Sequence, residues 1–260
     1  MNQFDKDLKI TIDNRSKLFK NKNLLYWYKK SYEVIFNNIE NIDNLSILEI
    51  GSGTSPIKHF YPNIKTSDIL PLDHCDYKFD ALKIDDLNEL DGKTFDIITF
   101  SNVLHHIEKP LDFLLKCEKR LNENGRLIFL EPYLSFFSRF IYKYIHHELT
   151  DESIIKPEIN CIQGPLSSSN SALPYLIFVK NNQWCSLVKE KFDIKQIFYF
   201  TSLSYFFTGG ISHKFPIPHF IYRGIFIIDS FLTRLFPKLL SSFFILQLEK
   251  RNNTTNVKNL

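Results

Sequence analysis

The chain has 260 residues, of which 32 are basic and 29 acidic, so its formal net charge is only +3. This near balance excludes the strongly basic field of a general nucleic-acid-binding protein. The length is sufficient for one α/β domain with an elaboration and for a sizeable buried core.

Cysteine usage and apolar patterning indicate a cytoplasmic protein. None of the 4 cysteines forms a C-x-x-C pair, which favours reduced thiols over a disulfide or zinc framework, and we predict no metal site. Residues 1–6 are polar and have no apolar signal core. No window supplies the roughly 20 uninterrupted apolar residues of a membrane-spanning helix. The richest stretch, 217–236, is interrupted by Pro218, Arg223, Asp229 and Arg234.

The first half of the chain alternates predicted strands with predicted helices. A helical period covers 24–42, a helix begins near Pro56 and another at Pro110, and a brief one covers 86–90. The predicted strands are 46–51, 65–68, 77–79, 95–100 and 126–130, the last following a helix stop at Asn124-Gly125. This alternation predicts a parallel, doubly wound sheet.

After Glu131 the periodicity is less regular. The predicted helices are 133–147, 171–179, 183–191 and 220–236, and the predicted strands are 194–200 and 242–248. The stretch 150–171 is typical of a loop, and we expect the polar residues 251–260 to fray. Much of the aromatic content, 25 Phe and 12 Tyr in all, falls in this half.

The most informative stretch runs from Ile47 to Ser55, where an apolar strand leads through Glu49 to Gly51 and Gly53. A side chain on either glycine would block the close approach of a ligand to the backbone at the end of a buried strand. The carboxylate of Glu49 disfavours a pyrophosphate and favours a positively charged amino group. S-adenosylmethionine (SAM) carries an ammonium, a sulfonium and no phosphate, so the electrostatics favour SAM over NAD.

Three motifs, in this order, resemble those of the class I SAM-dependent methyltransferases, specifically the group called methyltransferase type 11. They are Glu49 to Gly53, Asp68 at the end of the second strand, and the run from Phe95 to His106 with Pro110 after it. The resemblance covers roughly residues 45–132, about a third of the chain. It implies an α/β, Rossmann-like fold with a doubly wound, mostly parallel seven-stranded sheet. The aromatic-rich helical segment would be an elaboration after strand five.

The resemblance also implies a SAM site at the ends of these strands. The implied cofactor-binding residues are Glu49, Gly51, Ser52, Gly53, Asp68, Asp80, Ala81, Ser101 and Asn102. Glu49 would face the methionine amino group, and Asp68 would accept hydrogen bonds from both ribose hydroxyls. Asp80 with the Ala81 amide would recognise the adenine edge. The glycine loop would pack against the methionine and ribose portions, and Ser101 and Asn102 would lie under the methionine.

Three of these assignments have a structural alternative. Glu49 could merely cap the following helix, and Asp68 could be a loop residue near Pro71. The position of Asp80 is uncertain in register, because other aspartates are nearby. These are Asp76, Asp85 and Asp86.

Methyl transfer is an in-line displacement at a carbon on a sulfonium, so a base is needed only when a hydroxyl must lose its proton. The candidate bases are His105, His106, His146, His147, Glu131 and Glu148, and we select His106 and His147 as the candidate catalytic residues. His105 and His106 could equally shape the turn after the fourth strand. A helix would bring Arg139, Tyr142 and His146 to one face, which could recognise the acceptor or be a solvated surface.

We divide the chain into five segments. They are an N-terminal helical segment (1–44), a SAM-binding core (45–133), a helical and loop insertion that could cap the acceptor (134–192), C-terminal strands with an amphipathic helix (193–250) and a disordered tail (251–260). The aromatic side chains of the C-terminal segment could fill a core over the sheet edge. Alternatively, residues 214–240, in which Lys214 and other basic residues lie among Phe and Ile, could contact a membrane surface.

We therefore expect a cytoplasmic enzyme, peripheral at the inner face of the membrane in the second case. It would transfer a methyl group from SAM to a small-molecule, glycan or lipid-linked acceptor, most readily on oxygen, and nucleic acid is not an expected partner. A non-catalytic SAM-binding scaffold is the alternative. A nicotinamide-dependent oxidoreductase or epimerase is weaker, because Pro56 stands where the third glycine of a G-x-G-x-x-G loop would fall.

Overall fold

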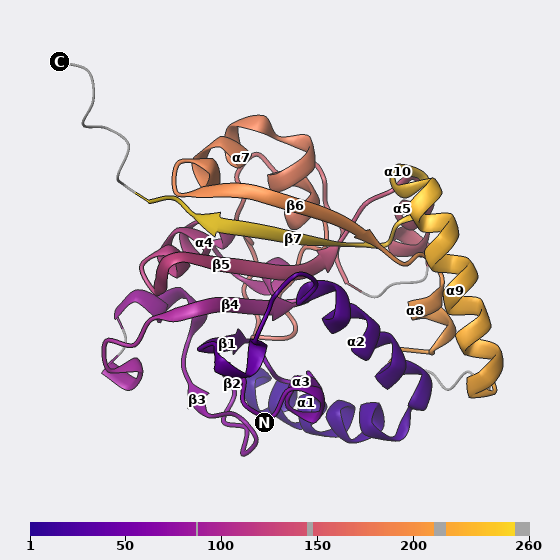
Figure 1. The fold of residues 1–260 in the computed structure, drawn as a ribbon, viewed down its shortest axis with the longest axis horizontal. Coiled ribbons are helices and arrows are strands. Elements are labelled where there is room, and N and C mark those ends of the chain that lie inside the picture. Colours follow the sequence, from indigo (N-terminus) through magenta and orange to yellow (C-terminus); the bar gives the residue numbers. More distant parts are fainter. Residues whose placement is uncertain (87, 145–147, 211–216, 253–260) are drawn as a thin grey trace.

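The computed structural model describes residues 1–86, 88–144, 148–210 and 217–252. Its centre is a seven-stranded sheet in the order β3-β2-β1-β4-β5-β7-β6 (Figure 1). Its strands are β1 (Ile47–Ile50), β2 (Lys65–Asp68), β3 (Tyr77–Lys78), β4 (Phe95–Ser101), β5 (Leu121–Pro132), β6 (Phe192–Phe200) and β7 (Phe243–Lys250). Strand β7 runs antiparallel to both β5 and β6, and the other pairs are parallel. The predicted doubly wound, mostly parallel sheet is confirmed.

Helices cover both faces of the sheet. They are α1 (Gln3–Lys20), α2 (Lys22–Ile35), α3 (Ile57–Phe60), α4 (Pro110–Glu118), α5 (Phe136–Tyr144), α6 (Leu173–Tyr175), α7 (Asn182–Lys189), α8 (Ser204–Phe207), α9 (His219–Leu235) and α10 (Pro237–Leu240). Shorter turns are the 3-10 segments η1 (Ile42–Asn44), η2 (Ala81–Asp86), η3 (Asn88–Leu90) and η4 (Leu104–His106), and the π-helical turn η5 (Leu176–Lys180).

The two-residue period of the strands decides which helices meet which face. On one face, Ile97 of β4 belongs to a core cluster with Trp27 of α2 and Phe226 of α9. On the other face, the adjacent Ile98 belongs to a cluster with Phe113 of α4 and Val188 of α7. Because successive side chains point to opposite faces, a short apolar strand supplies both cores.

Two predicted helix ends are wrong, each for a local backbone reason. The helix predicted over 24–42 ends at Ile35, and the chain turns where Asn38 and Asn41 adopt left-handed φ angles of 63° and 51°. The Asn124-Gly125 pair is not a helix stop. Helix α4 ends at Glu118, and Asn124, with φ of 59°, lies inside β5, where the pairing with β4 shifts register.

The second half also differs in detail from the prediction. The helix predicted over 133–147 begins only at Phe136, because the Tyr133 N–H donates to the Ser242 carbonyl (2.9 Å) and keeps the chain extended past β5. Residues 145–147 and 253–260 lie outside the described residues. Helices α1 and α8 were not predicted as separate elements. The sequence signal for α1 was available, because the Asn2 side chain accepts a hydrogen bond from the Asp5 N–H and caps the helix.

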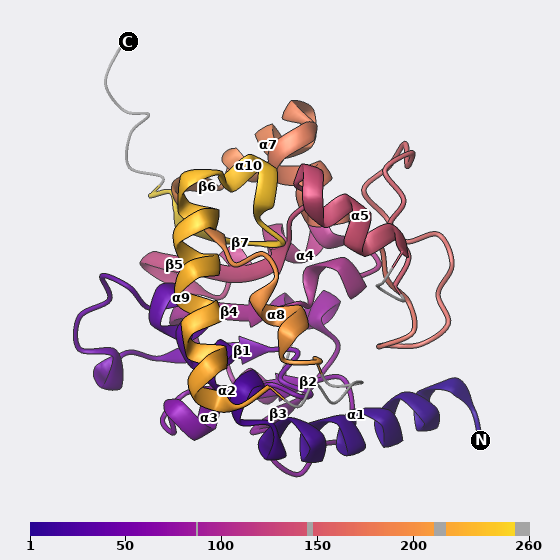
Figure 2. The ribbon, with the colours of Figure 1, turned by 90° about the vertical axis from the view of Figure 1, so that its right-hand side faces the viewer.

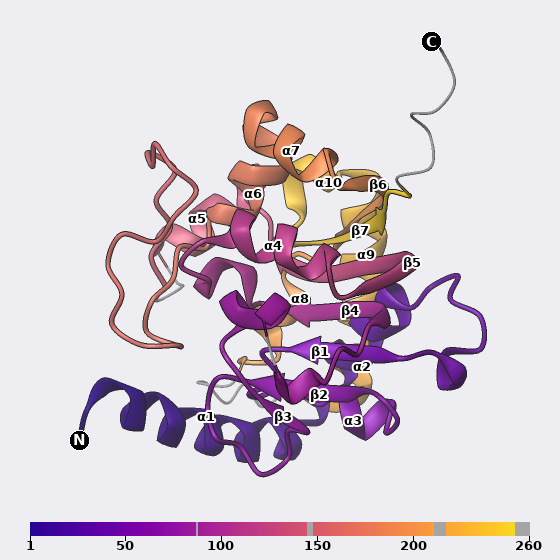
Figure 3. The same cartoon turned by 90° about the vertical axis from the view of Figure 1, so that its left-hand side faces the viewer.

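Strand β5 leads into α5 and strand β6 into α8, and these two helices lie with α9 and α10 at the right-hand side of Figure 1. Turned to face the viewer, this side presents α9 with α10 above it (Figure 2). From the opposite side, α1 lies across the bottom of the molecule below the long loop that follows α5 (Figure 3). Within the described part of the chain, no helix combines the length and the apolar run that a bilayer crossing requires.

Candidate active site

The main cavity has a volume of about 510 Å³ and lies at the carboxyl ends of the parallel strands. Ligands of open α/β sheets bind at this edge, and the volume falls in the range of small-molecule sites. Seven of the nine predicted cofactor residues line it, namely Gly51, Gly53, Asp68, Asp80, Ala81, Ser101 and Asn102. Glu49 and Ser52 lie behind the lining, and both are buried.

The glycine loop is fixed by close packing. Gly51 has a left-handed φ of 67°, and a Cβ added there would lie 2.5 Å from Cγ2 of Val103. The Gly53 N–H donates to Oδ2 of Asp68 (2.8 Å), so the loop after β1 is tied to the end of β2. The glycines therefore let the loop fold against its neighbouring segments, and the loop backbone forms one wall of the cavity.

Asp68 presents a carboxylate held in a fixed orientation at the end of β2. Oδ1 accepts the Leu70 N–H (2.9 Å), while Oδ2 accepts that of Gly53. Burial raises the pKa of Asp68 above its ordinary value, against the lowering effect of these backbone hydrogen bonds. Each oxygen keeps a lone pair for a second donor, as recognition of a ribose diol requires.

Glu49 is 1% exposed and lies between the glycine loop and α2. Oε1 accepts a hydrogen bond from Ser55 Oγ (2.7 Å), and Oε2 is buried with no hydrogen-bond partner among the described residues. Burial raises the pKa of Glu49 to about 7. The residue does not cap α3, whose N-cap is Pro56. A buried carboxylate oxygen without a donor fits a ligand that brings positive charge.

Asp80 and Ala81 line the cavity where η2 begins. Oδ1 of Asp80 accepts the Leu82 N–H (2.9 Å), which directs the carboxylate along the start of this turn. Asn102 has a left-handed φ of 57° at the end of β4, and its N–H donates to the Leu130 carbonyl (2.8 Å). The pairs Asp80-Ala81 and Ser101-Asn102, both predicted from the sequence, thus line the same cavity, the first after β3 and the second at the end of β4.

The two histidines after β4 form a compact polar cluster with two glutamates. Nδ1 of His105 lies 2.6 Å from Oε2 of Glu131, and Nε2 lies 3.2 Å from Oε2 of Glu148. Burial opposes charging of His105, but the Glu131 and Glu148 carboxylates prevail and raise its pKa to about 10. Burial and the neighbouring His105 lower the pKa of His106 to about 4. His106 is therefore a neutral ring at pH 7 on the cavity wall.

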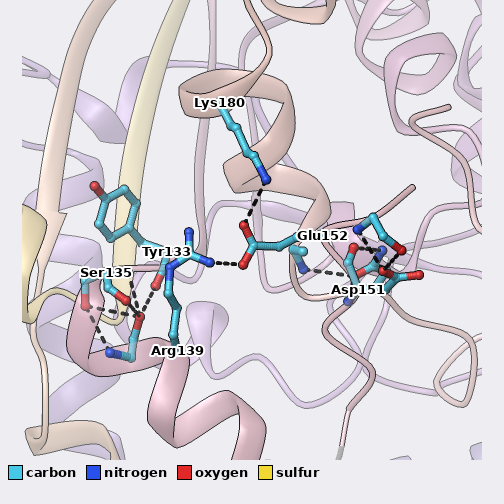
Figure 4. Close-up of polar contacts among 10 residues, drawn as sticks. Tyr133, Ser135, Arg139, Asp151, Glu152 and Lys180 are labelled. Carbon is cyan, nitrogen blue, oxygen red and sulfur yellow. Dashed lines mark hydrogen bonds and ion pairs between the residues drawn. The ribbon is translucent and has the colours of Figure 1, made fainter. Parts of the chain in front are cut away.

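The other candidate catalytic residue, His147, lies with His146 outside the described residues. The polar helix face predicted around Arg139 and Tyr142 is not a single ligand-binding face. Arg139 forms an ion pair with Glu152, which also contacts Lys180 at 3.3 Å (Figure 4). Tyr142 points inward to the cavity wall, and its hydroxyl donates to the Ser242 carbonyl (3.1 Å).

Helix α1 and the loop around 159–168 close the cavity, and the sequence analysis assigned neither to the site. Phe4 and Thr11 of α1 line it. Asp7 is buried, and its Oδ2 accepts the N–H groups of Leu166 (3.0 Å) and Ser167 (3.3 Å), which joins the helix to the loop. No local sequence motif predicts this contact, because its partners are about 160 residues apart in the chain.

The family comparison supports the interpretation of this edge of the sheet. Residues 68–127 match a family model described as a methyltransferase domain. A mostly parallel, seven-stranded sheet is what the sequence resemblance implied, and the structure adds that β7 is reversed beside β5. Residues 68–127 therefore belong to a methyltransferase domain, and they lie on a Rossmann-like sheet. Such a domain implies SAM as the methyl donor, and the orphaned Glu49 oxygen and the Asp68 carboxylate fit its ammonium and ribose.

The fold is similar to that of a solved methyltransferase structure. A SAM-dependent methyltransferase from Thermotoga maritima superposes with a TM-score of 0.55 at 12% identity, covering 94% of this chain and 98% of the other. The N-methyltransferase NodS from Bradyrhizobium japonicum, in complex with S-adenosyl-L-homocysteine, has a TM-score of 0.49 at 11% identity, covering 97% and 100%. No curated protein sequence matches this chain.

Proposed function

We propose that this methyltransferase methylates a hydroxyl oxygen of an acceptor anchored in an anionic lipid membrane. The observation that carries the proposal is the outer surface of α9 and α10, which we call the α9 surface. Its apolar side chains are between 41% and 76% exposed, and they are Phe220, Ile221, Ile227, Ile228, Phe231, Leu232, Leu235, Phe236 and Leu239. A contiguous exposed apolar patch of this kind marks an interaction surface.

The charged side chains around the α9 surface favour a membrane as its binding partner. The exposed charged side chains of residues 217–240 are Arg223, Arg234 and Lys238, all of them basic. The acidic residue of this segment, Asp229, is buried, and its carboxylate accepts the N–H groups of Ser202 (3.0 Å) and Ser204 (2.9 Å). An apolar face with basic borders is the pattern of a helix that lies in the interface of an anionic bilayer.

Helix α8 connects the cavity to α9. Tyr205 and Phe206 of α8 line the cavity, and the N-terminal end of α8 is held on α9 through Asp229. Figure 2 shows α9 and α8 on the same side of the molecule. An acceptor with a lipid portion in the membrane would therefore approach the cavity past α8.

The cavity residues suit an acceptor whose nucleophile is a hydroxyl. When bound, SAM supplies a methyl carbon on a sulfonium, and the acceptor oxygen forms the new C–O bond as the C–S electron pair returns to sulfur. An amine would arrive with a free lone pair, whereas a hydroxyl must also lose its proton. His106, neutral on the cavity wall, and the adjacent His105 supply groups that orient the hydroxyl, and its proton leaves to solvent through the cavity mouth.

Vesicle sedimentation tests the membrane component. The protein should sediment with phosphatidylglycerol vesicles and much less with phosphatidylcholine vesicles. The double variant I227S/F231S should lose this binding, and the matched control L187S, on α7 at the other face of the sheet, should keep it. Equal sedimentation of wild type and I227S/F231S would overturn the membrane assignment.

The acceptor class is tested with SAM labelled in its methyl group and a membrane fraction as the acceptor source. Label should enter the organic extract as a base-stable methyl ether, and I227S/F231S should reduce this labelling while its affinity for SAM is unchanged. Label that stays in the aqueous phase, or on nitrogen, would contradict the proposal and leave the methyltransferase assignment in place.

A further inference from the structure

Among the residues that the structure describes, one group of histidine and carboxylate side chains has the spacing of metal ligands. One atom each from His105, His106 and Glu148 lies within 4.8 Å of the others. Nε2 of His105 is 3.2 Å from Oε2 of Glu148, and Nε2 of His106 is 3.8 Å from Oε1 of the same carboxylate. All three side chains line the cavity.

Hydrogen bonds at the opposite ring nitrogens fix which nitrogen of each histidine is available. Nδ1 of His106 lies 2.8 Å from the Ser168 carbonyl, which can only accept, so this nitrogen carries the proton. Nδ1 of His105 faces Oε2 of Glu131, and Oε1 of Glu131 accepts the N–H groups of Val103 and Leu104 at 2.7 Å each. The Glu131 carboxylate is therefore a fixed acceptor. Nε2 of His106 is left with a lone pair on the side of Glu148, and Nε2 of His105 presents one there when it gives up its proton.

Once His105 has released that proton, three electron-rich atoms lie opposite one another. A proton on His105 would satisfy its contact with Glu148 but would leave the lone pair of His106 facing the same carboxylate. One divalent cation would satisfy all three atoms together. The supporting contacts are those of metal-binding histidines, whose second ring nitrogen donates to a carboxylate or a backbone carbonyl.

We propose that Nε2 of His105, Nε2 of His106 and the Glu148 carboxylate bind one first-row divalent transition-metal ion, such as Zn²⁺. Two imidazole nitrogens and one carboxylate suit such an ion, whereas Mg²⁺ and Ca²⁺ prefer sets of oxygen ligands. Three protein ligands leave a coordination position open toward the cavity, as catalytic sites do. The sequence analysis predicted no metal site, and this inference replaces that expectation.

The role of the ion in the reaction rests on the proposed hydroxyl acceptor. The binding of the ion to the protein does not. A hydroxyl oxygen at the open position would have a lower pKa and would release its proton to solvent more readily. The oxygen lone pair would then attack the methyl carbon, with the C–S electron pair returning to sulfur as above. The ion would activate the nucleophile without a change of oxidation state.

Titration of chelator-treated protein with Co²⁺ tests the site directly, because the visible absorption of Co²⁺ changes with its coordination number and geometry and needs no turnover. We expect one Co²⁺ per chain in competition with Zn²⁺, and no comparable binding of Mg²⁺. Glu148→Gln and His106→Gln should each weaken binding about 10- to 100-fold. Glu131→Gln should weaken it through the orientation of His105. The control Glu108→Gln, which removes one charge elsewhere on the cavity wall, should leave binding unchanged.

Circular dichroism and calorimetric titration with SAM identify any variant that has failed to fold. Wild-type protein that binds SAM but no Co²⁺ would overturn the metal site and leave the methyltransferase function standing. Equal Co²⁺ affinity in wild type, Glu148→Gln and His106→Gln would place the ion elsewhere and would also overturn it. Protein that binds Co²⁺ but does not methylate membrane acceptors would contradict the proposed function alone.

Discussion

Two walls of the cavity are built in different ways: the one that we expect to hold SAM, called the cofactor side, and the one that we expect to face the acceptor, called the acceptor side. The cofactor side comes from the ends of β1, β2 and β4 and from the start of η2, all within residues 49–102. The acceptor side combines η4 with Glu148, the loop around Ser168 and α8, and helix α1 reaches from that loop to the glycine loop. Short-range motifs can encode the first kind of wall, whereas the second exists only when distant segments pack together.

The comparison also concerns charge. On the cofactor side, the Glu49 and Asp68 carboxylates can accept hydrogen bonds from a ligand that carries a positive charge and hydroxyl groups. On the acceptor side, His105 already lies between Glu131 and Glu148, so the local charges are partly neutralised within the protein. Binding of the methyl donor should therefore depend strongly on single carboxylates, and its dependence on the acceptor-side cluster should be weak.

The largest expected effect comes from Asp68→Ala on the cofactor side. Loss of charge-assisted hydrogen bonds to the ribose should weaken SAM binding about 100-fold, or ~2.7 kcal/mol. Calorimetric titration measures this affinity, with Asp73→Asn, an exposed aspartate nearby, as the control for net charge. Unchanged affinity in Asp68→Ala would remove the basis for calling this wall the cofactor side.

A matched pair of glycine substitutions tests how tightly the loop after β1 is packed. Gly51 and Gly92 have nearly equal φ angles of 67° and 68°, but an added Cβ meets Val103 at Gly51 and nothing within 4 Å at Gly92. Gly51→Ala should lower the free energy of unfolding by about 2 kcal/mol, and Gly92→Ala by about 1 kcal/mol from backbone strain alone. Urea unfolding compares them. Equal losses would show that packing against Val103 contributes nothing.

The smallest expected effect is a pH dependence set by Glu49. Its pKa of about 7 lies above the ordinary value, so part of the population is protonated near neutrality. The positive charge of SAM favours the carboxylate, so binding should release protons, and affinity should rise about tenfold between pH 6 and pH 8. Calorimetry in phosphate and in Tris detects the released protons through the different ionisation enthalpies of the buffers. Glu49→Gln should remove both effects, and persistent proton release in that variant would assign it to another group.

The sign of the corresponding stability effect can be stated for the free protein. Ionisation of Glu49 is disfavoured by burial in the folded state, so the folded protein binds this proton more tightly than the unfolded chain. The free energy of unfolding should therefore fall as pH rises from the unfolded pKa, near 4.5, through about 7. SAM should offset this loss because it neutralises the buried charge.

The sequence by itself predicted the residues that form the cofactor side. An apolar strand followed by Gly51 and Gly53, an acidic residue closing β2 and the Phe95–Ser101 strand are local patterns, and the carboxyl ends of parallel strands must meet at one edge. The alternation of strands and helices likewise predicted the sheet. Local backbone geometry and short-range periodicity carry this information, so it can be read without knowledge of long-range packing.

Only the tertiary structure decided the acceptor side. No pattern in the sequence joins Asp7 to Leu166, places Glu148 against His105, or directs Arg139 away from Tyr142 toward Glu152. The exposure of Ile227 and the burial of Asp229 on one helix likewise depend on which face packs against α8 and the sheet. These contacts join residues that are distant in sequence, and the packing of the whole fold sets their geometry. The period of a helix shows which residues share a face, but it does not show which element packs against that face.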